Sequence, residues 1–324
     1  MQRIAPPVWA WRWGVALLTY MGTARTAFAQ GKEVEPLPWN WEPWVLACLL
    51  IAFSGYVYGV LRIRAGARAH VFGIWRYIAF VAGLGVLIVA LISPLDTLDD
   101  QLFCAHMVQH MLLMLVAPPL IVWGRPATAF LWAFPLSARR AIGRFWMRAP
   151  GVQSGIRTLI GPTSVWIFSS FALWFWHLPG PYGWALGNET VHTGEHLCFF
   201  LTSLAFWTIV LAPYGRRQLG YGSSLLFVGT LGVQMGLLGA ILTFATRPMY
   251  GMHASATIAW GLSPLEDQQL AGLIMWIPGD FLYLGVMIAM FVAWLHDAER
   301  YAIAAAAAPR DYSRQSTSFG PQRF

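Results

Sequence analysis

Seven long apolar runs constrain the fold of this chain more than any other feature of its sequence. An apolar segment of about 20 residues is long enough to cross the hydrocarbon core of a bilayer as an α-helix. Hydrophobic residues make up 57% of the 324 residues and charged residues only 11%, whereas soluble domains carry about 25% charged residues. We therefore predict an all-α fold, a polytopic membrane bundle of seven transmembrane helices. The runs extend from Trp44 to Leu61, Ile74 to Ile92, Leu102 to Trp123, Leu159 to Trp176, Val191 to Leu211, Gly222 to Phe244 and Leu270 to Leu295.

The N-terminus has the pattern of a secretory signal peptide. Arg3 and Arg12 precede a short apolar run, and the segment ends in Ala27-Phe28-Ala29. A positive start, a short apolar core and an Ala-x-Ala end are typical of such a peptide. We predict cleavage after Ala29; the alternative is an uncleaved anchor. The expected organisation is a signal peptide at 1–29, a short outer segment at 30–43, a membrane domain at 44–296 and a cytoplasmic tail at 297–324 with the composition of a disordered segment.

Basic residues are divided unequally between the two sides of the predicted bundle. Sixteen of the 21 lysines and arginines fall in the loops after spans one, three and five and in the tail, whereas the other side of the mature chain carries only Lys32 and Arg247. The positive-inside rule then places the N-terminus outside and the C-terminus inside, as a multi-pass protein of the cell (inner) membrane. The net charge of +7 comes from these loops, so we expect the lipid bilayer and no nucleic acid as a partner.

Two proline-containing segments are expected to depart from a regular span. Ala117-Pro118-Pro119 predicts a kink within span three. The stretch from Ala129 to Met147 is interrupted by Pro135 and by arginines. We expect it to lie along the inner interface as an amphipathic helix.

Six of the eight histidines lie near the outer ends of the predicted spans. His106 and His110 begin span three, and His192 and His196 begin span five; the members of each pair are four residues apart. A four-residue step turns about 400° around a helix, so each pair projects from one face. If the two helices were neighbours, four imidazoles would point to a common place. The six residues are His106, His110, His177, His192, His196 and His253.

Metal or haem binding is the functional interpretation of these histidines. Imidazole is the commonest metal ligand and suits Zn, Cu, Fe and Ni. Polar groups inside a membrane are costly and commonly mark a site, although a structural network of bonds between helices is the alternative. Met114 lies about 80° from His106 on a helical wheel and could join that face. A thioether would favour Cu(I); the alternative is an ordinary apolar packing role.

Three acidic residues are further candidates. Glu195 adjoins the second pair and could hydrogen-bond the metal-ligating histidines, or it could be a surface acid. Asp99 belongs to a group of acidic residues on the outer side that could concentrate cations; the alternative is a solvated loop residue. Asp280 follows Pro278-Gly279, where we expect a helix break. It is a functional candidate within the membrane, or a hydrogen-bond partner for freed backbone.

Several stretches of the sequence resemble the CtaG family of cytochrome c oxidase assembly factors, the seven-span, caa3 type. They are Ser93-Pro94-Leu95-Asp96, Ala105 to Met114 (AHMVQHMLLM), Ala117-Pro118-Pro119-Leu120, Glu195-His196-Leu197 and Pro264 to Trp276 (PLEDQQLAGLIMW), and the similarity extends over about residues 40 to 295. The resemblance implies a non-enzymatic assembly factor. It would bind copper on the outer side and aid its insertion into the catalytic subunit of a haem–copper oxidase, with an outer-side copper carrier as a further partner.

Two other functions remain open from the sequence. Histidines on facing helices can ligate haem iron, so a membrane cytochrome or a haem-modifying protein is the alternative. A proton or ion transporter using the histidines, Glu195 and Asp280 is a third possibility. Against the transporter, titratable groups concentrate in the outer half, whereas a path across the membrane needs polar steps at several depths. Cys48, Cys104 and Cys198 lie in apolar segments and are expected to be free thiols.

Overall fold

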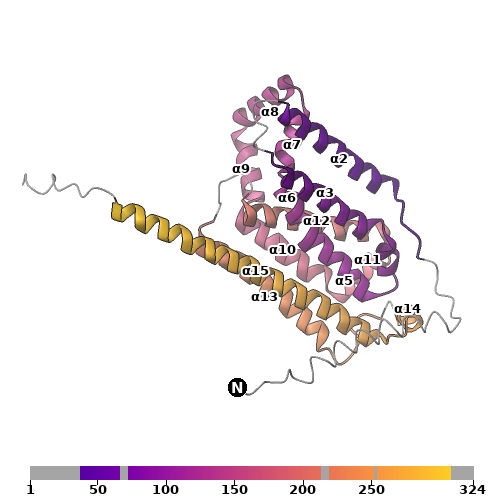
Figure 1. Cartoon of the computed structure of the whole chain (residues 1–324). Coiled ribbons are helices and arrows are strands. Elements are labelled where there is room, and N and C mark those ends of the chain that lie inside the picture. Colours follow the sequence, from indigo (N-terminus) through magenta and orange to yellow (C-terminus); the bar gives the residue numbers. More distant parts are fainter. Residues whose placement is uncertain (1–36, 66–71, 213–218, 252–253, 308–324) are drawn as a thin grey trace, which may run out of the picture.

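The computed structural model describes residues 37–65, 72–212, 219–251 and 254–307, which form a bundle of helices (Figure 1). The predicted signal peptide, His253 and residues 308–324 lie outside the described residues. The elements are α2 (Pro43–Arg64), α3 (Ile74–Leu91), α4 (Pro94–Asp99), α5 (Phe103–Met111), the π-helical η2 (Leu112–Val116), α6 (Ala117–Trp123), α7 (Pro126–Ala133), α8 (Leu136–Arg148), α9 (Pro150–Leu159), α10 (Pro162–Trp176), α11 (Pro179–Leu186), α12 (Glu189–Leu211), α13 (Tyr221–Thr243), α14 (Ala254–Ala259) and α15 (Pro264–Ala307).

Six of the described helical segments are long and apolar enough to cross a membrane, and a bent pair raises the number to seven. The pair is α9 and α10, which meet at an angle of 47°. Pro162 begins α10, and a proline disfavours helical backbone at the residue before it. The prediction of a polytopic all-α membrane bundle is confirmed, and its fourth span is the bent one.

The span formed by α5, η2 and α6 is the centre of the bundle. In its most apolar window 72% of the residues are buried, against 22% for α2 and 28% for α3. On one side it packs with α2, α3 and α7 through a cluster that includes Tyr56, Phe80 and Leu113. On the other side it packs with α10, α12, α13 and α15 through a cluster that includes Met107 and Phe206. Side chains on the central span therefore meet neighbours on every side.

The expected irregularity in span three is present and begins before the prolines, in η2. Pro118 has no N–H to donate to the carbonyl of Met114 four residues earlier. That carbonyl instead accepts a hydrogen bond of 3.0 Å from the indole Nε1 of Trp207 on α12. A side chain of a neighbouring helix thus satisfies a backbone group that the proline frees, as the bilayer interior requires.

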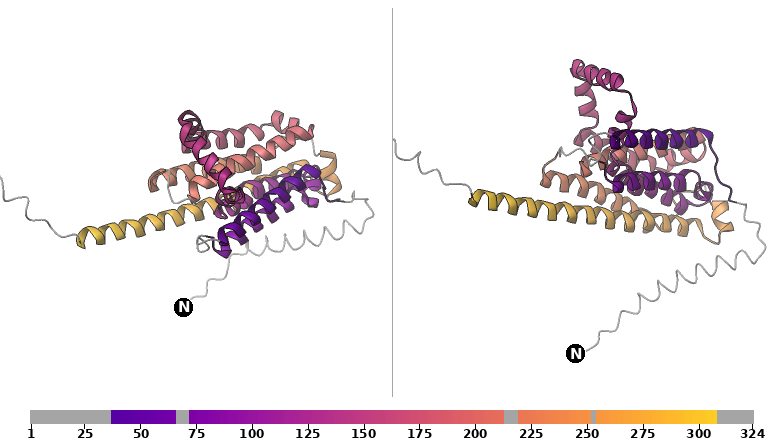
Figure 2. Two further views of the ribbon diagram at one scale, coloured as in Figure 1. Left: turned by 90° about the horizontal axis from the view of Figure 1, so that it is seen from above. Right: turned by 45° about the horizontal axis from the view of Figure 1, so that its top comes forward.

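The segment after the central span forms two helices rather than the single one expected. The chain breaks at Phe134-Pro135, because proline cannot continue the helix hydrogen bonds. α7 lies against α2, where Ala129 meets Gly59 so closely that a Cβ on Gly59 would fall 1.9 Å from the Ala129 carbonyl oxygen. α8 buries none of its residues, and Figure 2 shows it displaced from the helices of the bundle.

The last helix, α15, differs from the expectation at Pro278. Helical structure continues through this proline from Pro264 to Ala307, so the predicted break there is wrong. Proline removes one backbone donor without ending a helix when neighbouring helices support it. With 44 residues the helix is about 66 Å long, roughly twice the hydrocarbon thickness of a bilayer. Its C-terminal part extends beyond the other spans (Figures 1 and 2).

Alternating helix directions bring the candidate residues to one end of the bundle. α5 and α12 begin at this end and α10 finishes there, with the short helices α4, α11 and α14 nearby (Figure 1). We call it the histidine end. Among the described residues, the arginine-containing helices α8 and α9 lie at the opposite end.

Candidate metal centre

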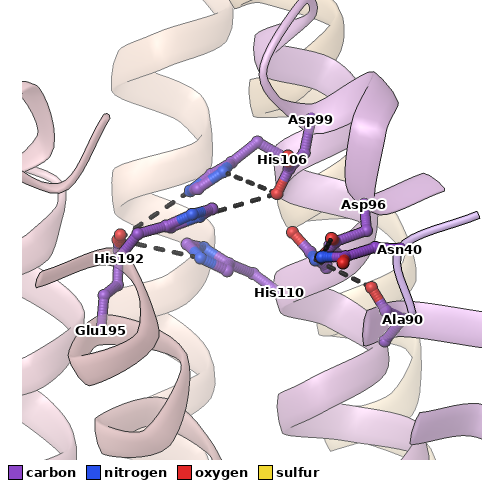
Figure 3. A network of polar contacts seen from close by, with 9 residues as sticks. Asn40, Ala90, Asp96, Asp99, His106, His110, His192 and Glu195 are labelled. Atoms are coloured by element: carbon purple, nitrogen blue, oxygen red, sulfur yellow. Dashed lines mark hydrogen bonds and ion pairs between the residues drawn. The ribbon is translucent and has the colours of Figure 1, made fainter. Parts of the chain in front are cut away.

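Four histidines and two carboxylates meet at the histidine end and form what we call the histidine cluster. Asp99 comes from the end of α4, His106 and His110 from α5, and the other three residues from the first turns of α12. Figure 3 labels the members of the cluster except His196. The sequence prediction that the two histidine pairs share one place is therefore supported by the fold. The members are Asp99, His106, His110, His192, Glu195 and His196.

Helix caps fix the three elements that carry these residues. Asn188 caps α12 by accepting a bond from the backbone N–H of Val191, and Ser93 caps α4. The residue before α5, Leu102, has no capping side chain. The carboxylate of Asp267 on α15 does this instead, accepting bonds of 2.7 and 2.9 Å from the N–H groups of Phe103 and Cys104. The first turn of α5, which leads to His106, is thus held by a distant helix.

The ring of His106 lies between the two carboxylates. Its Nδ1 is 3.6 Å from Oδ2 of Asp99, and its Nε2 is 3.9 Å from Oε1 of Glu195 (Figure 3). The Nε2 of His192 is also 3.6 Å from Oδ2 of Asp99, and the Nε2 of His110 is 3.8 Å from Oε1 of Glu195. Each carboxylate therefore faces two imidazoles.

Two groups of donors are compact enough to hold a metal ion. One consists of Asp99, His106, His192 and His196, and the other of His106, His110 and Glu195. Within each group one ligand atom per residue lies within 4.8 Å of all the others. Metal–nitrogen and metal–oxygen bonds of about 2.0–2.2 Å place opposite ligands about 4 Å apart. A small contraction would therefore bring either group to bonding distance.

Most of the polar atoms of the cluster are buried and lack hydrogen bonds among the described residues. Asp99, His106 and Glu195 are 1%, 0% and 0% exposed. Both oxygens of each carboxylate and both nitrogens of His106 and His110 are without a hydrogen-bond partner there. Buried polar groups are nearly always satisfied in folded proteins, and buried carboxylates need a positive partner. No lysine or arginine is among the buried residues of the described chain, so a metal cation fits the donor set.

His177 borders the cluster. Its ring centroid is 6.1 Å from that of His110, and its Nδ1 lies 2.7 Å from the carbonyl oxygen of Leu173. The hydroxyl of Tyr250 donates a bond of 2.6 Å to the His177 carbonyl. The second ring nitrogen of His177, Nε2, is buried and has no hydrogen bond among the described residues. Metal-binding histidines commonly hydrogen-bond through one ring nitrogen and bind the metal through the other.

Two of the predicted site residues lie elsewhere. Met114 is four residues further along the central span than His110, and its side chain packs against the hydrophobic cluster around Met107 and Phe206. The π-helical turn between His110 and Met114 changes the helical register on which the wheel argument relied. Asp280 is on α15 and lies against Gly236 of α13. A Cβ on Gly236 would fall 2.8 Å from a carboxylate oxygen of Asp280. Asp280 belongs to neither of the two donor groups.

A hydrogen-bond network beside the cluster was not predicted from the sequence. The side-chain Nε2 of Gln109 donates to the carbonyl of Ala90 and to Asp96, each at 2.8 Å. Asn40 donates to the other oxygen of Asp96 at 2.7 Å (Figure 3). These bonds join α3, α4 and α5 and so fix the position of Asp99 relative to His106. Gln109 and Asp267 both occur in the stretches that resemble the CtaG family, which was the one sequence signal for them.

A cavity of about 550 Å³ connects the cluster with the surface of the histidine end. Asp99, His192 and His196 are part of its wall. Asp96 also lines the cavity. Burial raises the pKa of its carboxyl group to about 6. Negative charge around a cavity raises the local concentration of cations. The other acidic lining residues are Glu42, Asp100 and Glu189.

Together, the fold and the cluster define a multi-pass helical membrane protein with a buried set of imidazole and carboxylate donors at one membrane face. The chain belongs to the family of cytochrome c oxidase caa3 assembly factors (Caa3_CtaG), whose model matches residues 54–297. This confirms the family that the sequence motifs indicated.

Three mycobacterial proteins, each described as uncharacterised, are similar to this chain. The protein of Mycobacterium leprae is 25% identical over 278 residues, which is 82% of this chain and 40% of the relative. The proteins of Mycobacterium bovis and Mycobacterium tuberculosis are each 23% identical over 275 residues, with the same coverage of 82% and 40%. The chain thus spans 40% of the length of these relatives. No solved structure matches the chain.

Proposed function

We propose that this protein is an assembly factor for a cytochrome c oxidase that binds copper in the histidine cluster and passes it to the catalytic subunit of the oxidase. Membership of the caa3 assembly factor family supports the assembly role. The observation that carries the copper proposal is the set of buried imidazoles and carboxylates without hydrogen bonds. Imidazole-rich sites bind copper tightly among the divalent first-row metals.

The charge distribution supports delivery on the outer face. The positive-inside rule assigns the arginine-rich end to the cytoplasm, which puts the histidine end and its acidic cavity outside. An outer-side copper carrier could load the ion through this cavity, whose wall includes His192 and His196. In this role the protein transfers a metal and catalyses no covalent reaction.

The packing of the cluster favours a metal ion over haem. The ring centroids of His106 and His110 are 4.1 Å apart, and those of His106 and His192 are 5.3 Å apart. The ring of Tyr182 lies 5.3 Å from that of His106. These separations are shorter than two imidazoles on opposite faces of one haem iron would have.

Copper content of the purified protein tests the proposal. The full chain, purified in detergent and loaded with Cu²⁺, should retain copper after desalting. The double variant His106→Ala/His196→Ala should lose it, and the control His296→Ala, which removes an exposed histidine of α15, should not. The absorption spectrum of the same samples should lack a haem band. Full copper retention by the cluster variant, or a haem band in pure protein, would reject the proposed site.

Delivery is tested in cells that lack the gene for this chain. Their oxidase catalytic subunit should contain haem but less copper, and oxidase activity should return with the wild-type gene and not with the His106→Ala/His196→Ala variant. Normal copper content of the oxidase in the deleted strain would contradict the assembly role.

A further inference from the structure

The two donor groups of the cluster are not independent, because His106 belongs to both. Resting on the proposed copper function, we propose that the cluster holds two copper ions at once, with the imidazole of His106 as the bridge between them.

The geometry of the His106 ring supports the bridge. Its Nδ1 faces Asp99 at 3.6 Å and its Nε2 faces Glu195 at 3.9 Å. The two nitrogens of an imidazole point in divergent directions, so a single ion cannot bind both. One ion on each side of the ring would place each carboxylate beside a different ion.

Each side of the ring has its own further ligands. The outer position has Asp99, His192 and His196 in addition to one nitrogen of His106, four donors in all. The inner position has Glu195, His110 and His106, whose Nε2 faces Glu195, three donors in all. A position with three protein ligands keeps a place open for an incoming ligand. His177, whose buried Nε2 has no hydrogen bond among the described residues, adjoins the inner position through His110.

The two positions differ in access. The 550 Å³ cavity is lined by three of the four outer ligands, Asp99, His192 and His196. The inner ligands His110 and Glu195 are absent from its wall, and both are buried. An ion arriving through the cavity therefore meets the outer position first.

Two cations would also place a positive charge beside each of the two buried carboxylates. Asp99 and Glu195 are both carboxylates that face only histidines in their ion pairs within the described residues. One dication on one side of the ring would leave the far carboxylate buried without a strong positive partner, which is costly. A neutral imidazole retains one ring proton. Binding of the second Cu²⁺ to His106 displaces this proton to water, the imidazole becomes an imidazolate, and no electron is transferred.

Copper stoichiometry and electron paramagnetic resonance of the Cu²⁺-loaded full chain test the bridge. The wild type should bind two copper ions per chain, with a spectrum of two coupled ions. His192→Asn, which affects the outer position, and His110→Asn, which affects the inner one, should each retain one uncoupled ion. His106→Asn should abolish the coupling and lower the affinity of both positions. His296→Asn, an exposed histidine on α15, is the matched control and should behave as the wild type.

The possible results separate this proposal from the copper function itself. One ion per wild-type chain, or two uncoupled ions, would overturn the bridge and leave the copper function standing. No bound copper would overturn both. Variants are compared after size-exclusion chromatography and circular dichroism have shown native helix content. Should either asparagine variant fail this check, Asp99→Asn replaces His192→Asn and Glu195→Gln replaces His110→Asn, with the same expected loss of one ion.

Discussion

Replacing Asp267 should destabilise the protein and weaken copper binding without changing any metal ligand. This side chain is 1% exposed and caps α5 from α15 by accepting bonds from the N–H groups of Phe103 and Cys104 at 2.7 and 2.9 Å. α5 has no side-chain cap of its own. Without Asp267 one buried and one partly buried donor would lose this acceptor, and the first turn of α5, which leads to His106, would loosen.

The size of the effect follows from the bonds that are lost. A hydrogen bond to a charged group contributes about 1.5–3 kcal/mol. Removal of the Asp267 charge also removes the cost of burying it, so we expect Asp267→Ala to lower the free energy of unfolding by about 2–4 kcal/mol rather than the full sum. Asp267→Asn keeps one acceptor oxygen but turns an amide NH₂ toward the second donor, and should lose about 1–2 kcal/mol.

The assay is thermal unfolding of the purified protein in detergent, together with a copper titration. A loss of 2–4 kcal/mol corresponds to a fall in Tm of roughly 3–6 °C for a chain of this size. Copper affinity should fall in Asp267→Ala, because His106 and His110 are on the loosened helix, and less so in Asp267→Asn. The neighbouring Glu266→Ala is the control: Glu266 accepts bonds from Ser263 within its own helix start, so copper binding should be unchanged. A Tm of Asp267→Ala within 2 °C of wild type, or wild-type copper affinity, would refute this role of the cap.

Three further predictions concern packing, pH and the surroundings of His177. Gly59→Ala should destabilise the protein by about 1–3 kcal/mol or more, because the new Cβ would fall 1.9 Å from the Ala129 carbonyl oxygen. The control is Gly85→Ala, which has nothing within 4 Å of its new Cβ and should melt at or above the wild-type Tm. Burial raises the folded-state pKa of Asp96 from 3.8 to about 6, so the protonated carboxyl stabilises the fold fully below pH 3.8 and this stabilisation is lost as the pH rises through 6. Asp96→Asn should remove this part of the fall in Tm between pH 4 and 7. An identical dependence of Tm on pH in the variant and the wild type would contradict the assignment. Tyr250→Phe should cost about 1–3 kcal/mol by leaving the buried His177 carbonyl without its hydrogen bond, measured by the same thermal unfolding with Tyr58→Phe, an exposed tyrosine, as control.

The sequence identified the spans well because the bilayer imposes a simple rule on it. Each span must satisfy its backbone internally and be apolar over about 20 residues, so seven runs could be counted without knowledge of their packing. Local chemistry at the span ends was harder to predict. The expected break at Pro278 does not occur, whereas the break at Gly161-Pro162 bends the fourth span by 47°, because neighbouring helices decide whether a proline ends a helix.

The sequence by itself determined that two pairs of histidines would each project from one helix face near the same membrane surface, since a four-residue spacing and the length of a span require only the geometry of the α-helix. Only the tertiary structure decided that α5 and α12 are neighbours, and that Asp99 and Glu195 face opposite nitrogens of His106. It also decided that Met114, which is half-buried, packs against the hydrophobic core and that Asp267, distant in sequence, holds the start of α5. The physical reason is that such contacts depend on which helices pack together and in which rotation, and apolar spans of similar length and composition carry little of that information along the chain.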